Sequence, residues 1–102
     1  MNTLLRPLGK IRDIVLSTGL DISYAYDDLV FSENSVFIIQ FDEFMEDKIH
    51  VYFNSDCFSK EAAVLEKRLR IAAQIGGFTL LNSGNFTLEP KGSREEIEIH
   101  FP

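Results

Sequence analysis

Residues 48–54 read KIHVYFN, in which Ile49, Val51 and Phe53 alternate with more polar side chains. A period of two is typical of a β-strand that buries one face and exposes the other. The end of the chain has the same pattern, because EIEIHFP at residues 96–102 places apolar side chains at alternate positions. We therefore expect both segments to be strands whose apolar positions point toward one core.

Two further stretches carry apolar residues at alternating intervals of three and four, the period of an amphipathic helix. The first covers residues 3–18 and the second about residues 59–75. Gly19 follows the first, and Gly76 and Gly77 follow the second, as expected where a helix ends. The apolar positions are Leu4, Leu8, Ile11 and Val15 in the first helix and Phe58, Ala62, Leu65, Leu69 and Ala72 in the second, where Val64, Ile71 and Ile75 widen the stripe.

The other apolar segments are typical of β-strands separated by turn residues. Before the second helix they are LDISYAY (20–26), DDLVF (27–31), VFIIQFD (36–42) and KIHVYFN. After it they are FTLLN (78–82), FTLEP (86–90) and EIEIHF (96–101), with SGN and KGS as the turns of a meander. The predicted element order is therefore α-β-β-β(-β)-α-β-β-β, with antiparallel pairing favoured by the short connections.

This pattern predicts one α+β domain over residues 1–102, with two helices packed on one face of a mainly antiparallel sheet. Each half would hold a helix followed by strands that end in the alternating motif, which makes the chain a possible structural repeat. The helices would cover Ile49, Val51, Phe53, Ile97, Ile99 and Phe101, whereas His50, Tyr52, Glu98 and His100 would face outward.

Composition excludes several classes of partner. The net charge of -6, from 16 acidic and 10 basic side chains, would repel a phosphate backbone, so we expect no nucleic-acid partner. No apolar run approaches the roughly 20 residues that cross a bilayer, and no signal peptide is recognisable, so we expect a cytosolic protein without a membrane partner. The single cysteine permits no internal disulfide.

Cys57 in NSDCFSKE is a candidate nucleophile, because a helix begins there and its dipole can lower a thiol pKa. A nucleophile also needs a base, and neither His50 nor His100 has a recognisable spacing to this cysteine. We therefore interpret Cys57 as a small, inert residue and expect Asp56 or Ser59 to cap the helix.

The segment DEFMED gathers carboxylates but lacks the ligand spacing and central glycine of a calcium loop. We interpret it as a solvated acidic turn that discourages pairing of neighbouring strand edges. Phe44 and Met45 within it either tuck over the end of the core or stand out as an apolar contact point. The sequence has no recognisable order of serine, histidine and aspartate and no nucleotide fingerprint, so no catalytic residue, metal or cofactor is predicted.

The element order, with an N-terminal helix, a strand meander, a central helix after FNSDCFS and strands after IGGFTLL, resembles the small acidic α+β chaperones of type III secretion. The resemblance covers most of the chain and rests on layout and acidity. It implies a dimeric, non-enzymatic protein that holds an extended segment of a partner. The chain departs from that family by ending in the strand EIEIHF, where the family has a further helix.

Our leading hypothesis is a non-enzymatic cytosolic binding or adaptor module, chaperone-like, that forms a homodimer through a sheet edge or the outer sheet face. VFIIQFD supports self-association because apolar side chains lie at both odd and even positions, so that both faces of this strand are apolar, as in a strand buried on both sides. The rival is a small-molecule binding protein or minor enzyme with a pocket between helices and sheet. The candidate contact residues are His50, Tyr52, Glu98, His100, Phe44 and Met45, and the alternative pocket would be lined by Tyr24, Tyr26, His50 and Cys57.

Overall fold

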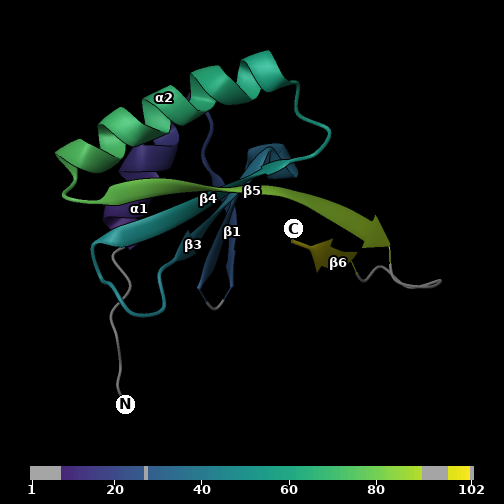
Figure 1. The fold of residues 1–102 in the computed structure, drawn as a ribbon, viewed down its shortest axis with the longest axis horizontal. Helices are drawn as coiled ribbons and strands as arrows, with labels where there is room; N and C mark the ends of the chain where they lie inside the picture. The colour runs from purple at the N-terminus through teal and green to yellow at the C-terminus, as the bar shows by residue number, and fades with distance from the viewer. Residues whose placement is uncertain (1–7, 27, 91–96, 102) are drawn as a thin grey trace.

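The computed structural model describes residues 8–26, 28–90 and 97–101 (Figure 1), and the side chains of Glu89, Pro90, Ile97, Glu98 and His100 lie outside this description. The predicted α+β class is confirmed. In chain order the elements are α1 (Leu8–Leu16), β1 (Ile22–Tyr26), β2 (Leu29–Ser32), the short 3-10 helix η1 (Glu33–Ser35), β3 (Phe37–Phe41), β4 (Lys48–Asn54), α2 (Ser59–Ile75), β5 (Thr79–Pro90) and β6 (Ile97–His100).

The strands lie side by side in the order of the sequence, from β1 at one end to β6 at the other. All neighbouring pairs are antiparallel except β4 and β5, which are parallel. Helix α2 connects these two strands and returns the chain to the end of the sheet where β4 began, as a parallel pair requires. The sheet is thus mainly antiparallel, as predicted, and FTLEP pairs with the C-terminal strand in the expected antiparallel way, whereas β4 and β5 on either side of the second helix are parallel.

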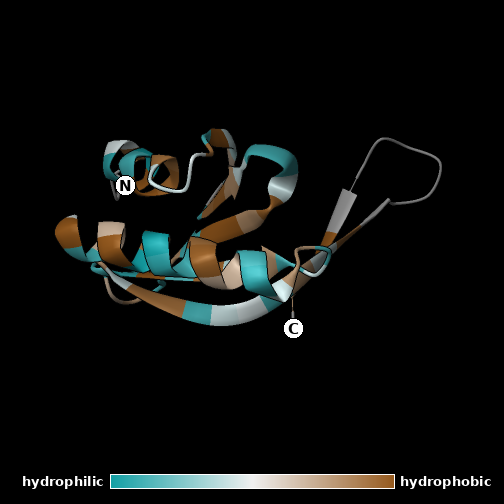
Figure 2. Cartoon of the chain, turned by 90° about the horizontal axis from the view of Figure 1, so that it is seen from above, coloured by the Kyte–Doolittle hydropathy of each residue, from teal (hydrophilic) through white to brown (hydrophobic). Residues whose placement is uncertain are grey.

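Strand β5 also replaces two predicted strands and the turn between them. It runs without interruption from Thr79 to Pro90, pairing first with β4 and then with β6. The SGN segment lies inside it, and Figure 2 shows this polar middle between two hydrophobic ends. A glycine flanked by polar residues is typical of a turn, but inside a strand it marks a bulge. The KGS turn lies outside the described residues.

Helix α2 has the predicted bounds, and Gly77 beyond its end has a φ of 86°, which a residue with a Cβ adopts only at a steric cost. The capping prediction is wrong, because the N-cap residue is Phe58 and its side chain makes no capping bond. The turn before the helix is held instead by the side chain of Asn54, which accepts a hydrogen bond from the backbone N–H of Asp56 at 2.9 Å. No helix in the described ranges has the length and hydrophobicity to span a bilayer.

The main core lies between the helices and one face of the sheet. Strand β4 alternates between buried and half-buried residues along its whole length, as its sequence predicts. Val64, Ile71 and Ile75 do not widen the buried stripe of α2, since Ile75 is 84% exposed and the other two are about half exposed. The core cluster is formed by Ile11, Ile14, Val15, Val30, Phe37, Ile39, Phe41, Ile49, Val51, Phe53, Leu65, Leu69, Ala73, Phe78 and Leu80.

Strand β6 does not contribute to this core in the way the alternating motif suggested. The ring of Phe101 lies 4.5 Å, centre to centre, from that of Tyr52, and Ile99 lies in a cleft with Tyr24 and Tyr26. These neighbours belong to the opposite face of the sheet, so the expected packing of Ile99 and Phe101 under the helices is wrong. Strand β4 has a partner on each side, whereas β6 pairs with β5 alone among the described strands. The two motifs are therefore not equivalent parts of a repeat.

Candidate functional site

The face of the sheet turned away from the core cluster, called the outer face below, carries the side chains that the core leaves out. Residues paired across neighbouring strands point to the same side, so the register identifies them. They are Tyr24 and Tyr26 of β1, Leu29 and Phe31 of β2, Ile38 and Gln40 of β3, and His50 and Tyr52 of β4.

One part of the outer face is an apolar cleft, called the aromatic cleft below, of about 540 Å³. Residues of β1 and β2 form one wall, and residues of β5 and β6 form the other. Tyr24 and Tyr26 are 57% and 60% exposed, and their rings lie stacked with centres 6.4 Å apart. The cleft is lined by Ser23, Tyr24, Tyr26, Leu29, Phe31, Ser35, Leu88 and Ile99.

A bulge in β1 aims both tyrosines into this cleft. The register shifts between Ile22 and Tyr24, and the hydroxyl of Ser23 donates to the backbone carbonyl of Ser32 at 3.0 Å. Ile22 before the bulge packs against the main core, whereas Tyr24 and Tyr26 after it face the other side. Bulges commonly re-aim side chains in this way near the edge of a sheet.

Next to the cleft, the chain covers its own outer face. Ile38 is fully buried although it belongs to the outer side of β3, and Tyr52 lies opposite it with the Phe101 ring against it. Strand β3 is therefore buried on both sides, as VFIIQFD suggested. The cover on the second side comes from the same chain, so the burial of Ile38 needs no second copy.

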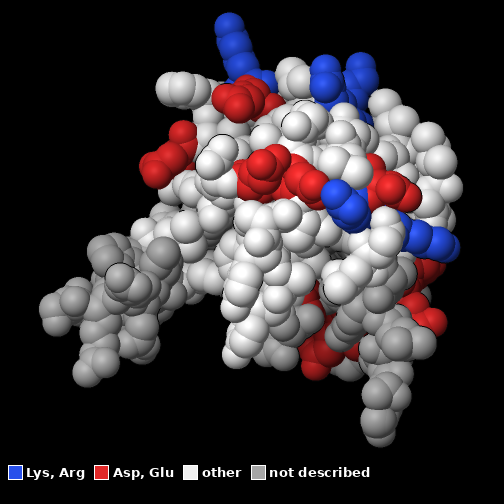
Figure 3. Space-filling model, turned by 180° about the vertical axis from the view of Figure 1, so that it is seen from behind, with Lys and Arg blue, Asp and Glu red and all other residues white. Residues whose placement is uncertain are grey.

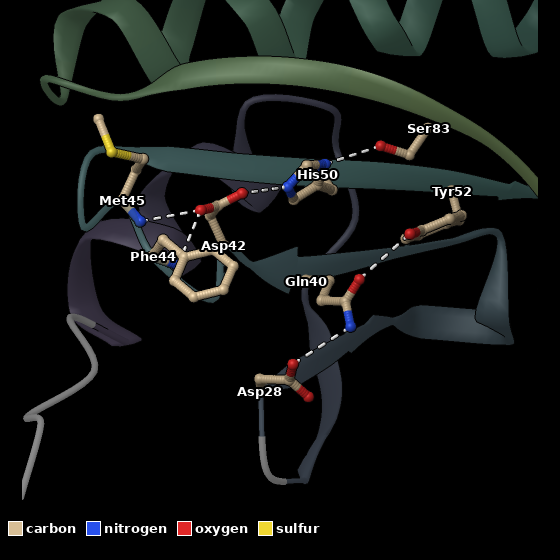
Figure 4. A network of polar contacts seen from close by, with 8 residues as sticks. All are labelled: Asp28, Gln40, Asp42, Phe44, Met45, His50, Tyr52 and Ser83. Carbon is tan, nitrogen blue, oxygen red and sulfur yellow. Dashed lines mark hydrogen bonds and ion pairs between the residues drawn. The ribbon is translucent and has the colours of Figure 1, made fainter.

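The other part of the outer face is polar and is held by a line of hydrogen bonds (Figure 4). The Asp42 carboxylate lies 2.7 Å from Nε2 of His50, and Nδ1 of the same ring lies 2.8 Å from Oγ of Ser83. The second carboxylate oxygen of Asp42 accepts the backbone N–H groups of Phe44 at 3.0 Å and Met45 at 2.8 Å. The hydrogen bond with His50, followed by those two N–H groups, lowers the pKa of Asp42 to about 2.

A second polar line crosses the same strands. The Tyr52 hydroxyl donates to Oε1 of Gln40 at 3.1 Å, and Nε2 of Gln40 donates to the carboxylate of Asp28 at 3.1 Å. Together the two lines connect Asp28, just before β2, with β3, β4 and β5 across the outer face (Figure 4). Polar side chains in such networks hold one another in a fixed orientation.

The structure places the predicted contact residues as follows. His50 and Tyr52 are on the outer face as predicted, but both are half-buried and hydrogen-bonded. Phe44 is 84% exposed and Met45 is 47% exposed, so these two stand out from the acidic turn. The side chains of Glu98 and His100 lie outside the description of the structure.

The four residues predicted to line one pocket are not brought together. Tyr24 and Tyr26 line the aromatic cleft, whereas His50 lines a separate hollow of about 260 Å³. Cys57 lines a third hollow, of about 220 Å³, near the start of α2. Burial raises the pKa of the Cys57 thiol, and the charge of Glu61 adds to the effect, which is opposite to the lowering that a helix start can give.

Sequence reasoning missed Ser83 and the role of Asp42. Ser83 belongs to SGN, a sequence typical of a turn, and Asp42 is one of several acidic residues that are typical of a solvated loop. Asp42, His50 and Ser83 form one hydrogen-bonded line, which no recognisable order of these residues in the sequence indicates. A glycine inside an otherwise apolar strand pattern is the one local signal of the bulge that carries Ser83.

Neither the charged side chains nor the potential metal ligands of the described residues indicate a further site. Acidic and basic side chains are interspersed on the face seen in Figure 3. Within residues 8–26, 28–90 and 97–101, no three histidine, cysteine or carboxylate side chains are grouped to hold a metal ion.

Comparison of the chain with protein-family models, with curated proteins and with solved structures found no match.

Proposed function

We propose that the chain is a cytosolic binding or adaptor module that forms a homodimer through the edge of β1, beside the aromatic cleft. The observation that carries the proposal is that β1 is an exposed edge strand. This strand lies at the end of the sheet order and pairs with β2 alone among the described strands, and residues 23–26 are exposed. An edge strand presents unpaired N–H and C=O groups to which another strand can be added.

The side chains of β1 favour a second copy of the same strand. Antiparallel pairing centred on Ala25 would place Tyr24 opposite Tyr26 of the partner subunit, on the outer side of the joined sheets. Aromatic residues directly opposite each other stabilise such pairs. Both aromatic clefts would then adjoin the new interface, which would bring together the tyrosines of the two copies, more than half exposed in one copy.

The charges at the two ends of β1 agree with this orientation. Arg12 binds Asp21 just before the strand, with 3.0 Å between the charged groups, and Asp28 lies just after its end. An antiparallel pair brings the start of one strand to the end of the other, so Arg12 would approach Asp28 of the partner subunit. Opposite charges at such positions favour one orientation over others.

The proposal extends to a chaperone-like role, in which the dimer holds an extended segment of another protein. Support comes from the aromatic cleft, because apolar side chains of such a segment need a concave apolar surface next to polar groups. Stacked tyrosines provide rigid contact area and hydroxyl groups at the same time.

The association is tested by sedimentation equilibrium of the wild type and of Ala25→Lys, which places a charge on the edge of β1. We expect a wild-type dimer at tens of micromolar, roughly the concentration at which weak dimers form, and a monomer for the variant. The control is Ile71→Lys on the exposed side of α2, which should remain dimeric. A monomeric wild type at these concentrations, or dissociation by the control alone, would rule out this interface.

A second candidate function is the binding of a small aromatic molecule in the aromatic cleft. Its volume of about 540 Å³ favours this, since it falls within the roughly 300–1,000 Å³ of ligand sites. Thermal unfolding in the presence of a metabolite library is the test. A ligand that raises the melting temperature of the wild type, but not of Tyr24→Ala, and that binds the monomer, would favour this function over dimerisation.

A further inference from the structure

Three residues from separate parts of the chain meet on the polar side of the outer face. Asp42 follows β3, His50 lies in the middle of β4, and Ser83 lies in β5. Both hydrogen bonds that join them are short, at 2.7 Å and 2.8 Å. The side chains of His50 and Asp42 are only 23% and 18% exposed, so water competes only weakly for these hydrogen-bonding groups.

The hydrogen bonds determine which way the imidazole points its basic nitrogen. An ionised carboxylate only accepts hydrogen bonds, so in neutral His50 the proton sits on Nε2, facing Asp42. Nδ1 then carries the lone pair and accepts the hydroxyl proton of Ser83. The two backbone N–H groups that bind Asp42 hold the carboxylate in place and so fix this tautomer.

The bulge in β5 explains why Ser83 reaches His50. Val51 pairs with Asn82 and Tyr52 pairs with Gly84, so Ser83 is the extra residue between two consecutive partners. Gly84 has a φ of 116°, which favours glycine, and its N–H donates to the side chain of Asn82 at 2.9 Å. A regular strand would not supply this additional residue between the partners of Val51 and Tyr52, from which Ser83 reaches the His50 ring.

From this geometry we infer that Asp42, His50 and Ser83 form a nucleophilic site that transfers acyl groups from small esters to water. Ser83 Oγ attacks the ester carbonyl as its proton passes to Nδ1 of His50, and Asp42 stabilises the resulting imidazolium. The leaving alcohol takes that proton, which leaves an acyl-serine. Water then attacks the acyl group, with His50 again accepting and returning a proton, and the products are a carboxylic acid, an alcohol and free Ser83.

The surroundings of His50 indicate the class of ester. The adjoining hollow of about 260 Å³ is lined by Asp28, Gln40, Phe41, Asp42, Glu43, Phe44 and His50. Ser83 is not among these lining residues, so the hollow lies beside the Asp42 side of His50 and influences the substrate through its charge, because its carboxylates repel anions. The inferred substrates are therefore neutral or cationic esters. Ser83 belongs neither to the β1 edge nor to the lining of the aromatic cleft, so this inference and the proposed dimer can fail separately.

The test uses a fluorophosphonate probe, which phosphonylates activated serines with loss of fluoride, together with the hydrolysis of para-nitrophenyl acetate. We expect labelling at Ser83, located by mass spectrometry, and about a 100-fold loss of the rate of para-nitrophenyl acetate hydrolysis in Ser83→Ala, because the nucleophile is removed. Ser55→Ala is the matched control, because Ser55 is exposed and should react no faster than an ordinary serine. The anionic ester para-nitrophenyl hydrogen succinate should react more slowly than the acetate.

Asp42→Asn separates a catalytic arrangement from a structural one. The amide oxygen still accepts the N–H groups of Phe44 and Met45, while the amide nitrogen donates to Nε2 of His50. The ring proton then moves to Nδ1 and points at Ser83, so Ser83 loses its base although the turn is kept. Nitrogen NMR of the imidazole reports the tautomer and circular dichroism the fold.

We expect labelling of Asp42→Asn to fall to the level of Ser83→Ala, together with the change of tautomer. Absence of labelling at Ser83 in the folded wild type would overturn the inference. Equal labelling of Ser83 in the wild type and in Asp42→Asn, with the tautomer changed, would also overturn it.

Discussion

The two faces of the sheet are built on different principles. On the helix side, alternate residues of β3 and β4 meet the buried stripes of α1 and α2 in one continuous apolar core. The outer face is divided between the aromatic cleft, the surface covered by Phe101, and the polar lines through His50 and Gln40. Local periodicity determines the first face, whereas the second depends on where the end of the chain folds back.

The largest loss of stability should follow truncation of a side chain in the helix-side core. Leu69 of α2 is fully buried there, so Leu69→Ala removes apolar contacts and leaves a cavity. We expect the free energy of unfolding to fall by about 2–5 kcal/mol. Denaturant unfolding measures this loss. Val64→Ala on the same helix, where the side chain is 53% exposed, should cost less than about 1 kcal/mol. Similar losses in both variants would contradict the placement of the core.

Truncation of Phe101, which packs on the outer face, should lower the free energy of unfolding less than truncation of the helix-side core. Phe101 packs on Tyr52 but is itself 39% exposed, so Phe101→Ala should lower the free energy of unfolding by about 1–2 kcal/mol. Phe44→Ala is the matched control, because its ring is 84% exposed and its loss should change stability by less than about 0.5 kcal/mol. If Phe101→Ala is as neutral as the control, the C-terminal strand does not stabilise the outer face.

The sequence predicts the helix side well because its signals are local. The bounds of α2 follow from an apolar stripe and two glycines, and the burial of Ile49, Val51 and Phe53 follows from alternation. The exposure of Ile75 does not follow, because an apolar side chain next to a buried stripe looks the same whether or not a neighbour covers it.

The outer face is predicted poorly because its parts come from distant segments. The aromatic cleft joins residues 23–35 to Leu88 and Ile99, and the line through His50 joins Asp42 to Ser83. Parallel pairing of β4 with β5 and the bulge at Ser83 decide these contacts. A polar segment with a glycine permits a turn as readily as a bulge, and only the tertiary structure selects one of them.

A third prediction concerns pH, which acts on the outer face through Asp42. Its pKa is lowered to about 2 in the folded chain, against an ordinary value of about 3.9, so the unfolded chain binds the proton more readily. The stabilisation is complete above the ordinary pKa and is lost as the pH falls from about 4 to about 2.

Denaturant unfolding of the wild type and of Asp42→Asn across this range measures that contribution. The wild type should be the more stable protein at neutral pH, and the difference should shrink as the acid limit is approached. A difference that stays constant between neutral pH and about pH 2 would show that the hydrogen bonds of Asp42 do not depend on its charge.

The smallest effect is expected for Cys57, near the start of α2, which belongs neither to the core cluster nor to the outer face. Its Sγ lies 3.7 Å from the backbone carbonyl of Phe58, a weak contact that a serine hydroxyl can replace with a stronger hydrogen bond. Cys57→Ser should therefore change the free energy of unfolding by less than about 1 kcal/mol and should affect neither the proposed dimerisation nor the inferred reaction of Ser83 with esters. Because burial and Glu61 raise the thiol pKa, iodoacetamide should modify wild-type Cys57 at neutral pH more slowly than it modifies a cysteine in a short peptide. Modification faster than in the peptide, or loss of ester hydrolysis in a folded Cys57→Ser variant, would contradict an inert Cys57 and indicate a reactive thiol at the start of α2.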